Sequence, residues 1–278
     1  MALLATTDAF ELRQAADVSE STGPRSGMLQ MRLETTRGRW HCSIWESSWR
    51  LRIVLHLNSD QKLRVIYYVR NLHMSLAEMK LYHCKNSRSL RPLWALEEMG
   101  LDYDLVTMAF PPRFEYEGYL DINPLGTVPS LVDGELTLTE STAICHYLVD
   151  SYGPTPLAIR PDEQEYGEYL NWLYRSDATL TFPQTLVLRY TRLEPKKRRV
   201  PQVVEDYTKW YFSRLRSVES ALEGKEFLCA DRFTIADIAV GYALFMGISL
   251  GLSEHYKPNC KRYLAGLMGR NGFKKAMA

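Results

Sequence analysis

One proline restricts the fold of this chain more than any other residue. Pro129 stands at the head of a short apolar run, and Asp133–Gly134 joins that run to a second one, Glu135 to Leu138. A proline has no N–H to donate to a sheet ladder, so it is tolerated only at the start or the edge of a strand. Asp-Gly between two apolar runs is a strong signal for a two-residue hairpin. We therefore expect a strand that begins at Pro129 and turns back at Gly134.

The same segment predicts a binding edge. If the Val128–Pro129 bond is cis, the chain turns sharply and leaves the N–H and C=O of Val128 free beside the sheet. Glu140 and Ser141 follow at a predicted helix start, where unpaired N–H groups attract a carboxylate and Glu140 offers a charge for an ammonium group. Taken singly, Pro129 is a strand terminator and Ser141 is an N-cap. Their joint spacing favours a receptor for a small peptide with a zwitterionic end.

The segments around this hairpin alternate between strand and helix patterns. Strand patterns cover residues 80–84 and 101–108, and helix patterns cover residues 89–100, 115–122 and 141–152. Gly100 and the Gly153–Pro154 pair are the expected helix stops. The order strand, helix, strand, helix, hairpin, helix predicts an α/β domain over residues 79–154.

The rest of the chain after residue 154 has helical patterns. Residues 155–160 belong to a proline-rich segment and are the expected linker. From Pro201 onward apolar residues recur at helical spacing over about six turns. Thr234 and Asp237 form a capping box before a helix that is apolar almost all round. Residues 161–278 are therefore predicted to form an all-α domain with this helix at its centre.

Residues 1–78 differ from the rest because they lack a sustained period. Only Leu51 to Val69 has two apolar runs around a turn, Asn58 to Asp60, and this pattern is consistent with a hairpin. We expect a poorly ordered or dispensable N-terminal extension, with a hairpin docked on the domain as the alternative.

Composition excludes several classes of function. Lys and Arg number 34 against 33 Asp and Glu, so the net charge of +1 gives no field toward nucleic acid or an anionic membrane. The five cysteines contain no CxxC pair, which favours a reducing compartment, and we expect a cytoplasmic protein. The six histidines have no ligand spacing, so we expect no metal. No apolar run is long enough to span a bilayer.

Three motifs in order carry a resemblance to a known family. The stretch NPLGTVPSLVDGELTLTES, preceded by KLYHCKNSRSLRPLWALEEMGLDYDL and followed by the capping box of Thr234 and Asp237, resembles the cytosolic glutathione transferases over residues 79–278. The resemblance implies a thioredoxin-like domain that binds glutathione as co-substrate and an all-helical C-terminal domain that shapes a pocket for a small electrophile. It also implies a homodimer.

The resemblance assigns roles to the residues of the binding edge. Val128, before the cis-proline Pro129, would pair with the cysteinyl backbone of glutathione, and Glu140 and Ser141 would hold the γ-glutamyl end. Thr127 stands where many relatives have a lysine, which weakens the case for a charged contact to the glycyl carboxylate.

Activation of glutathione requires that its thiol become a thiolate. A free thiol has a pKa of about 8.5, and each unit of depression requires about 1.4 kcal/mol of preferential stabilisation of the anion. Ser87 and Ser89 stand where the first strand gives way to the first helix, as in the serine-using, bacterial-like branch with its SRS-like motif. Pro92 in the first helical turn makes Ser89 the expected N-cap, with its oxygen engaged. We therefore favour Ser87 as the thiolate donor and Arg88 as a secondary electrostatic contributor.

Two other functions remain open at this point. Cys84 and Ser87 form a CxxS, which suggests a glutathione-dependent thiol-disulfide oxidoreductase. Cys84 falls at the end of the strand, before a helix dipole can lower its pKa, so a structural thiol is the better interpretation. A non-catalytic binding module on the same fold is the second alternative. For the transferase, Tyr169, Trp172 and Phe182 are candidates for the electrophile pocket, although aromatic residues at helical spacing more often belong to the core.

Overall fold

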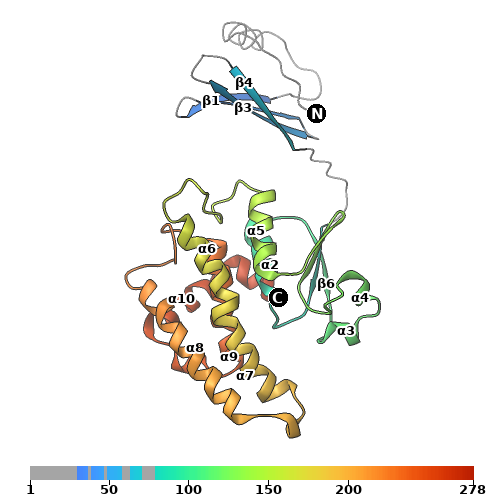
Figure 1. Ribbon diagram of the computed structural model, residues 1–278, viewed down its shortest axis with the longest axis vertical. Helices are drawn as coiled ribbons and strands as arrows, with labels where there is room; N and C mark the ends of the chain where they lie inside the picture. The colour runs from blue at the N-terminus through green and yellow to red at the C-terminus, as the bar shows by residue number, and fades with distance from the viewer. Residues whose placement is uncertain (1–29, 37–38, 47–48, 58–62, 71–78) are drawn as a thin grey trace. The chain divides into compact units, whose positions relative to one another are not determined.

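The computed structural model describes residues 79–278 throughout, and before them the backbone of residues 30–36, 39–46, 49–57 and 63–70 (Figure 1). The chain divides into two units, Met1–Ala77 and Glu78–Ala278. Each unit is described by itself.

The first unit contains an antiparallel sheet with the strand order β1-β2-β3-β4. Its strands are β1 (Gln30–Thr36), β2 (Arg39–Glu46), β3 (Trp49–Leu57) and β4 (Leu63–Arg70). Leu51 pairs with Val69, so the hairpin considered for this segment is present. The first two strands were not predicted, although Trp40, Cys42 and Ile44 alternate with polar residues along β2, which is a strand signal. The expectation for the remainder of residues 1–78 lies outside the described residues.

The second unit begins with the predicted α/β arrangement. Its elements are β5 (Lys80–His83), α2 (Leu90–Met99), β6 (Asp104–Thr107), α3 (Pro112–Glu115), α4 (Tyr119–Ile122), β7 (Ser130–Asp133), β8 (Leu136–Leu138) and α5 (Ser141–Ser151). The sheet has the order β6-β5-β7-β8, with β5 parallel to β6 and antiparallel to β7. Helices α2 and α5 cover one face of this sheet, and α3 and α4 lie on the other (Figure 1). The predicted thioredoxin-like fold is confirmed.

Two details differ from the predicted pattern. The single helix expected over residues 115–122 is reduced to α4, because α3 ends at Glu115, Tyr116 has an extended backbone and Gly118 adopts a left-handed conformation with φ 75°. The strand β7 begins at Ser130, one residue after Pro129, whose peptide bond to Val128 is cis.

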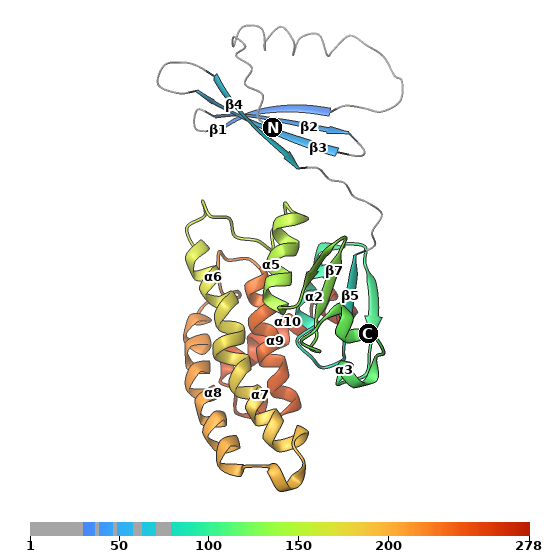
Figure 2. The same cartoon turned by 45° about the vertical axis from the view of Figure 1, so that its right-hand side comes forward.

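The remainder of this unit is helical, as expected. It comprises α6 (Tyr166–Arg175), the π-helical η2 (Ser176–Thr181), α7 (Phe182–Leu188), the π-helical η3 (Arg189–Leu193), α8 (Pro201–Ala221), α9 (Ile235–Ser249), α10 (Pro258–Met268), α11 (Asn271–Met277) and two short 3-10 turns. The capping box is present: Asp237 accepts from the N–H of Thr234 at 2.8 Å, and Thr234 accepts from the N–H of Ala236. The first part of α9 is buried, and the helix packs against α6, α10 and α2 (Figure 2). None of the helices in the described part of the chain is both long and apolar enough to cross a membrane.

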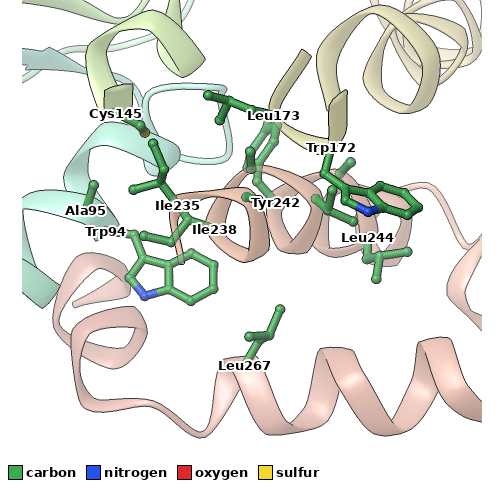
Figure 3. Close-up of a cluster of buried hydrophobic side chains, with 14 of the residues drawn as sticks. Trp94, Ala95, Cys145, Trp172, Leu173, Ile235, Ile238, Tyr242, Leu244 and Leu267 are labelled. Atoms are coloured by element: carbon green, nitrogen blue, oxygen red, sulfur yellow. The ribbon is translucent and has the colours of Figure 1, made fainter. Parts of the chain in front are cut away.

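One hydrophobic core joins the α/β part to the helical part. Trp94 of α2 lies 5.7 Å from Phe233 and 5.0 Å from Phe273, measured between ring centroids. Figure 3 shows Trp94 among side chains of α9 and α10. The expected linker, residues 155–160, also contributes to this core, because Leu157 and Ile159 are buried in it. The core therefore fixes α2 and α5 relative to the helices that follow.

Candidate active site

The sequence-predicted binding edge lies at the carboxyl end of β5. Tyr82 is paired with Ser130 in the antiparallel ladder, so extension of that register places Val128 and Pro129 beside the residues that follow Tyr82. The turn from β5 to α2 starts at the same end of the strand. The fold thus brings the cis-proline loop next to the two candidate serines.

The backbone N–H and C=O of Val128 make no hydrogen bonds within residues 79–278, in contrast to the carbonyl of Thr127. The carbonyl of Thr127 accepts hydrogen bonds from Tyr119 Oη at 2.6 Å and Asn123 Nδ2 at 2.8 Å, and Asn123 is buried. Tyr119 and Asn123 therefore hold the loop while Val128 remains available to a ligand.

The start of α5 places Ser141 and Glu140 in different environments. Ser141 is the first residue of the helix and is 3% exposed, and its Oγ accepts a hydrogen bond from Arg91 Nη1 at 3.0 Å. Glu140 occupies the N-cap position and is exposed, with no side-chain capping bond. Ser141 retains its hydroxyl hydrogen for a ligand, and the first N–H groups of α5 lie at the positive end of the helix dipole.

Arg91 is a site residue that sequence reasoning missed. Its side chain is fully buried and donates to acceptors on three other elements: the carbonyls of Ser176 and Ala239 and the side chains of Ser141, Asp177 and Thr181. The guanidinium carbon also lies 4.6 Å from the ring centre of Tyr242. A charged residue at a position between Leu90 and Leu93 was the available signal, because an arginine is almost never fully buried unless it is paired.

Asp177 connects Arg91 to Arg88. Its Oδ1 lies 2.9 Å from Arg91 Nη1 and 2.9 Å from Arg88 Nε, and Arg88 also donates to Thr185. Burial raises the pKa of Asp177, but attraction to Arg91 and Arg88 outweighs it and holds the pKa below the ordinary value. One carboxylate thus faces two guanidinium groups, which leaves excess positive charge behind Ser141. Arg88, expected near the thiolate, is held by residues of the helical part.

Ser87 and Ser89 form a hydrogen-bonded pair in the turn before α2. Their Oγ atoms are 2.7 Å apart, and the N–H of Ser89 donates to Ser87 Oγ at 3.3 Å. Ser89 is fully buried at the N-cap position, but its hydroxyl makes no capping bond, so that part of the prediction was wrong. Its Oγ instead lies 2.8 Å from His83 Nδ1. Ser87 is the more exposed of the two serines.

The environment of Cys84 disfavours chemistry at this thiol. The side chain is fully buried, its Sγ lies 3.5 Å from the carbonyl of Ala109, and burial raises the pKa of Cys84 to about 11. The thiolate required for disulfide exchange is therefore scarce at neutral pH.

The candidates for the electrophile pocket are divided by their burial. Tyr169 and Trp172 are 1% and 6% exposed within the core, so of the two roles considered for them, pocket lining or core packing, the structure supports core packing. Phe182 is 48% exposed and stays available for that role. The helical periodicity of α6 does not distinguish a core face from a pocket face.

One group of metal-ligand residue types does occur in the described part of the chain. Ligand atoms of Glu165, Glu168 and Cys229 lie within 4.8 Å of one another. Glu165 already accepts a hydrogen bond from the N–H of Ala230, and burial raises the pKa of Cys229 to about 12. In the metal-free chain the Cys229 thiol is therefore protonated at neutral pH.

A thioredoxin-like sheet with a cis-proline edge, followed by a helical region on a shared core, defines a two-part class of protein with an α/β part and an all-helical part. A family model described as "Glutathione S-transferase, N-terminal domain" matches residues 77–150. The chain is 30% identical over 194 residues to glutathione S-transferase 3 of Schizosaccharomyces pombe, covering 66% of this chain and 80% of that protein. It is 31% identical over 216 residues to a glutathione S-transferase of Hypomyces subiculosus, covering 72% and 98%.

Solved structures agree with these relatives. The glutathione transferase URE2P6 from Phanerochaete chrysosporium, in complex with oxidized glutathione, superposes with a TM-score of 0.64 at 26% identity, covering 73% of this chain and 96% of that one. A glutathione S-transferase from Actinobacillus pleuropneumoniae gives a TM-score of 0.61 at 30% identity, covering 71% and 90%. This chain belongs to the glutathione S-transferase family and is a glutathione-dependent transferase.

Proposed function

We propose that glutathione binds between Val128 and the start of α5, and that Ser87 stabilises its thiolate for attack on a small electrophile. The observation that carries the proposal is the free backbone of Val128 beside the turn that holds Ser87. The cysteinyl N–H and C=O of glutathione pair with Val128. The γ-glutamyl carboxylate accepts from Ser141 and the first N–H groups of α5, and Glu140 receives the ammonium group.

In the reaction, the thiol releases its proton to water and Ser87 donates a hydrogen bond to the sulfur anion. The thiolate then forms a carbon–sulfur bond with the electrophile, and the leaving group departs with the electron pair of the bond that breaks. Ser87 acts by stabilising the anion, so this is a serine-type enzyme. We infer a homodimer in the cytoplasm with a role in detoxification.

A panel of electrophiles with and without glutathione tests the proposal, together with calorimetry of glutathione binding to the same preparation. Glutathione-dependent conjugation of an activated aryl halide is the expected result. Binding without turnover on any electrophile would favour the non-catalytic binding module. Reduction of a mixed disulfide that is lost in Cys84→Ser would favour the oxidoreductase, against which the burial of Cys84 argues.

A further inference from the structure

His83 is a buried titratable residue that the proposed mechanism does not use. It ends β5, is 5% exposed, and its Nδ1 lies 2.8 Å from Ser89 Oγ. Burial, which is the largest effect, and the charge of Lys85 lower the pKa of His83, while a hydrogen bond with the backbone of Ser89 raises it by less than burial lowers it. The imidazole is therefore neutral at physiological pH, with one hydrogen on either Nδ1 or Nε2.

The position of that hydrogen decides how the hydroxyl of Ser89 is used. Ser89 Oγ accepts from the N–H of Cys84 at 3.2 Å, so one of its two lone pairs is occupied. The carbonyl of Cys84 lies 3.3 Å from the same oxygen and is one of the acceptors within reach of the Ser89 hydrogen. When Nδ1 of His83 carries the hydrogen, it fills the second lone pair. Ser89 then has no room to accept from Ser87, so the 2.7 Å contact between the two hydroxyls is satisfied when Ser89 donates to Ser87 rather than to the more distant carbonyl of Cys84.

The same count applies to Ser87. Its Oγ accepts from the N–H of Ser89 at 3.3 Å and, in this arrangement, from the hydroxyl of Ser89 as well. Both of its lone pairs are occupied, so its own hydrogen must point to a group outside the turn. In the opposite tautomer Ser89 donates to His83 Nδ1, the 2.7 Å contact consumes the hydrogen of Ser87, and nothing is left to stabilise a sulfur anion.

We propose that His83 is a positioning residue for thiol activation: its Nδ1–H, relayed through Ser89, directs the hydroxyl hydrogen of Ser87 to the sulfur of glutathione. This inference rests on the proposed function, because it requires glutathione at Ser87. In this proposal His83 sets the direction of the hydrogen bonds from Ser89 to Ser87, although His83 itself touches no substrate.

The test compares His83→Asn with His83→Leu, two side chains of similar size. The amide of asparagine can donate to Ser89 from the position of Nδ1, and leucine cannot. The readout is the pH at which bound glutathione shows half of its ultraviolet thiolate absorbance, with glutathione affinity measured by calorimetry. We expect His83→Leu to raise this midpoint by roughly one pH unit, which is a tenfold loss of thiolate on the acid side. His83→Asn should lie close to the parent, and affinity should change little in either.

A second arm separates the relay from packing. In a Ser87→Ala background the difference between His83→Leu and His83 should vanish, since the relay has no end point. If the leucine variant does not fold, His83→Asp replaces it, because a carboxylate only accepts and draws the hydrogen of Ser89 inward. An unchanged midpoint in His83→Leu, or equal shifts in the asparagine and leucine variants, would overturn the inference alone. A parent protein with no thiolate absorbance would overturn the proposed function as well.

Discussion

Arg91 Nη1 donates a hydrogen bond to Ser141 Oγ at 3.0 Å, and thereby joins the buried charge of α2 to the first residue of α5. The same guanidinium contacts Asp177 of η2 and the carbonyl of Ala239 in α9. One side chain therefore links α2 and α5 of the α/β part to the helical region. A ligand carboxylate at Ser141 would lie directly in front of this positive charge.

Replacement of Ser141 by alanine should weaken glutathione binding. The lost charge-assisted hydrogen bond corresponds to roughly 1–3 kcal/mol. Calorimetric titration measures the change, and Ser151→Ala, at the opposite end of α5, is the matched control. Equal affinities of the parent and Ser141→Ala would remove Ser141 from the binding site.

Replacement of Ser87 by alanine should lower turnover without a matching loss of binding. We expect a decrease of roughly one to two orders of magnitude in the rate with an activated aryl halide, or about 1.4–2.7 kcal/mol of lost anion stabilisation. Ser89→Ala should have a smaller effect, because it interrupts the relay and leaves the Ser87 donor in place. A larger loss in Ser89→Ala, with an unchanged melting temperature, would mean that Ser89 is the thiolate donor.

Arg91 should be far more important for stability than Arg88, although both contact Asp177. Arg91→Met leaves the carbonyls of Ser176 and Ala239 without this donor and removes the buried partner of Asp177, whose own side chain is 34% exposed. Removal of one partner of a fully buried ion pair costs about 3–5 kcal/mol, so this range is the upper limit that we expect. Arg88 is one-third exposed, so we expect Arg88→Met to cost no more than about 1 kcal/mol. Urea unfolding of the two variants under identical conditions gives both free energies. Similar losses in the free energy of unfolding of the two variants would show that the burial of Arg91 does not determine its contribution to stability.

Asp177 should make the free energy of unfolding depend on pH in the acid range. Its pKa is depressed in the folded chain, so the stabilisation it provides is present above the unfolded value of about 3.9 and is lost as pH falls through the lower folded value. The urea midpoint of the parent should therefore fall more steeply between about pH 5 and pH 2 than that of Asp177→Asn. Parallel pH profiles would contradict this assignment.

Local signals in the sequence predicted the parts of the fold that depend on neighbouring residues. Pro129, the Asp133–Gly134 turn and the Thr234 capping box each act within a few residues, and each lies where the pattern placed it. The roles of Arg91 and His83 depend on partners that only the fold brings near. No periodicity reports that the acceptors of Arg91 come from η2, α5 and α9.

The same distinction explains the error at Ser89. An N-cap position is a statement about local sequence, and the serine does occupy it. The turn 84–88, however, brings His83, Cys84 and Ser87 within reach of its hydroxyl, and these contacts replace the capping bond. Competing local hydrogen bonds of this kind are common for serine and are not encoded in the spacing.

The last prediction concerns residues 1–78, which we propose contribute nothing to glutathione chemistry. The described residues of the site all belong to the unit Glu78–Ala278, whose core includes the buried Met79. A chain that begins at Met79 should bind and turn over glutathione like the full chain. Because that start places a charged amino group at a buried residue, a second chain that begins at Met74 serves as its control.

The two truncated chains separate three outcomes. If both melt within about 2 °C of the full chain, the extension contributes less than about 1 kcal/mol to this unit. A lower melting temperature for the Met79 chain alone would reflect the buried terminal charge, since the Met74 chain lacks the same strands. Loss of several degrees or of activity in both would mean that the sheet β1–β4 stabilises the transferase unit, and the proposal that the extension is dispensable would be abandoned.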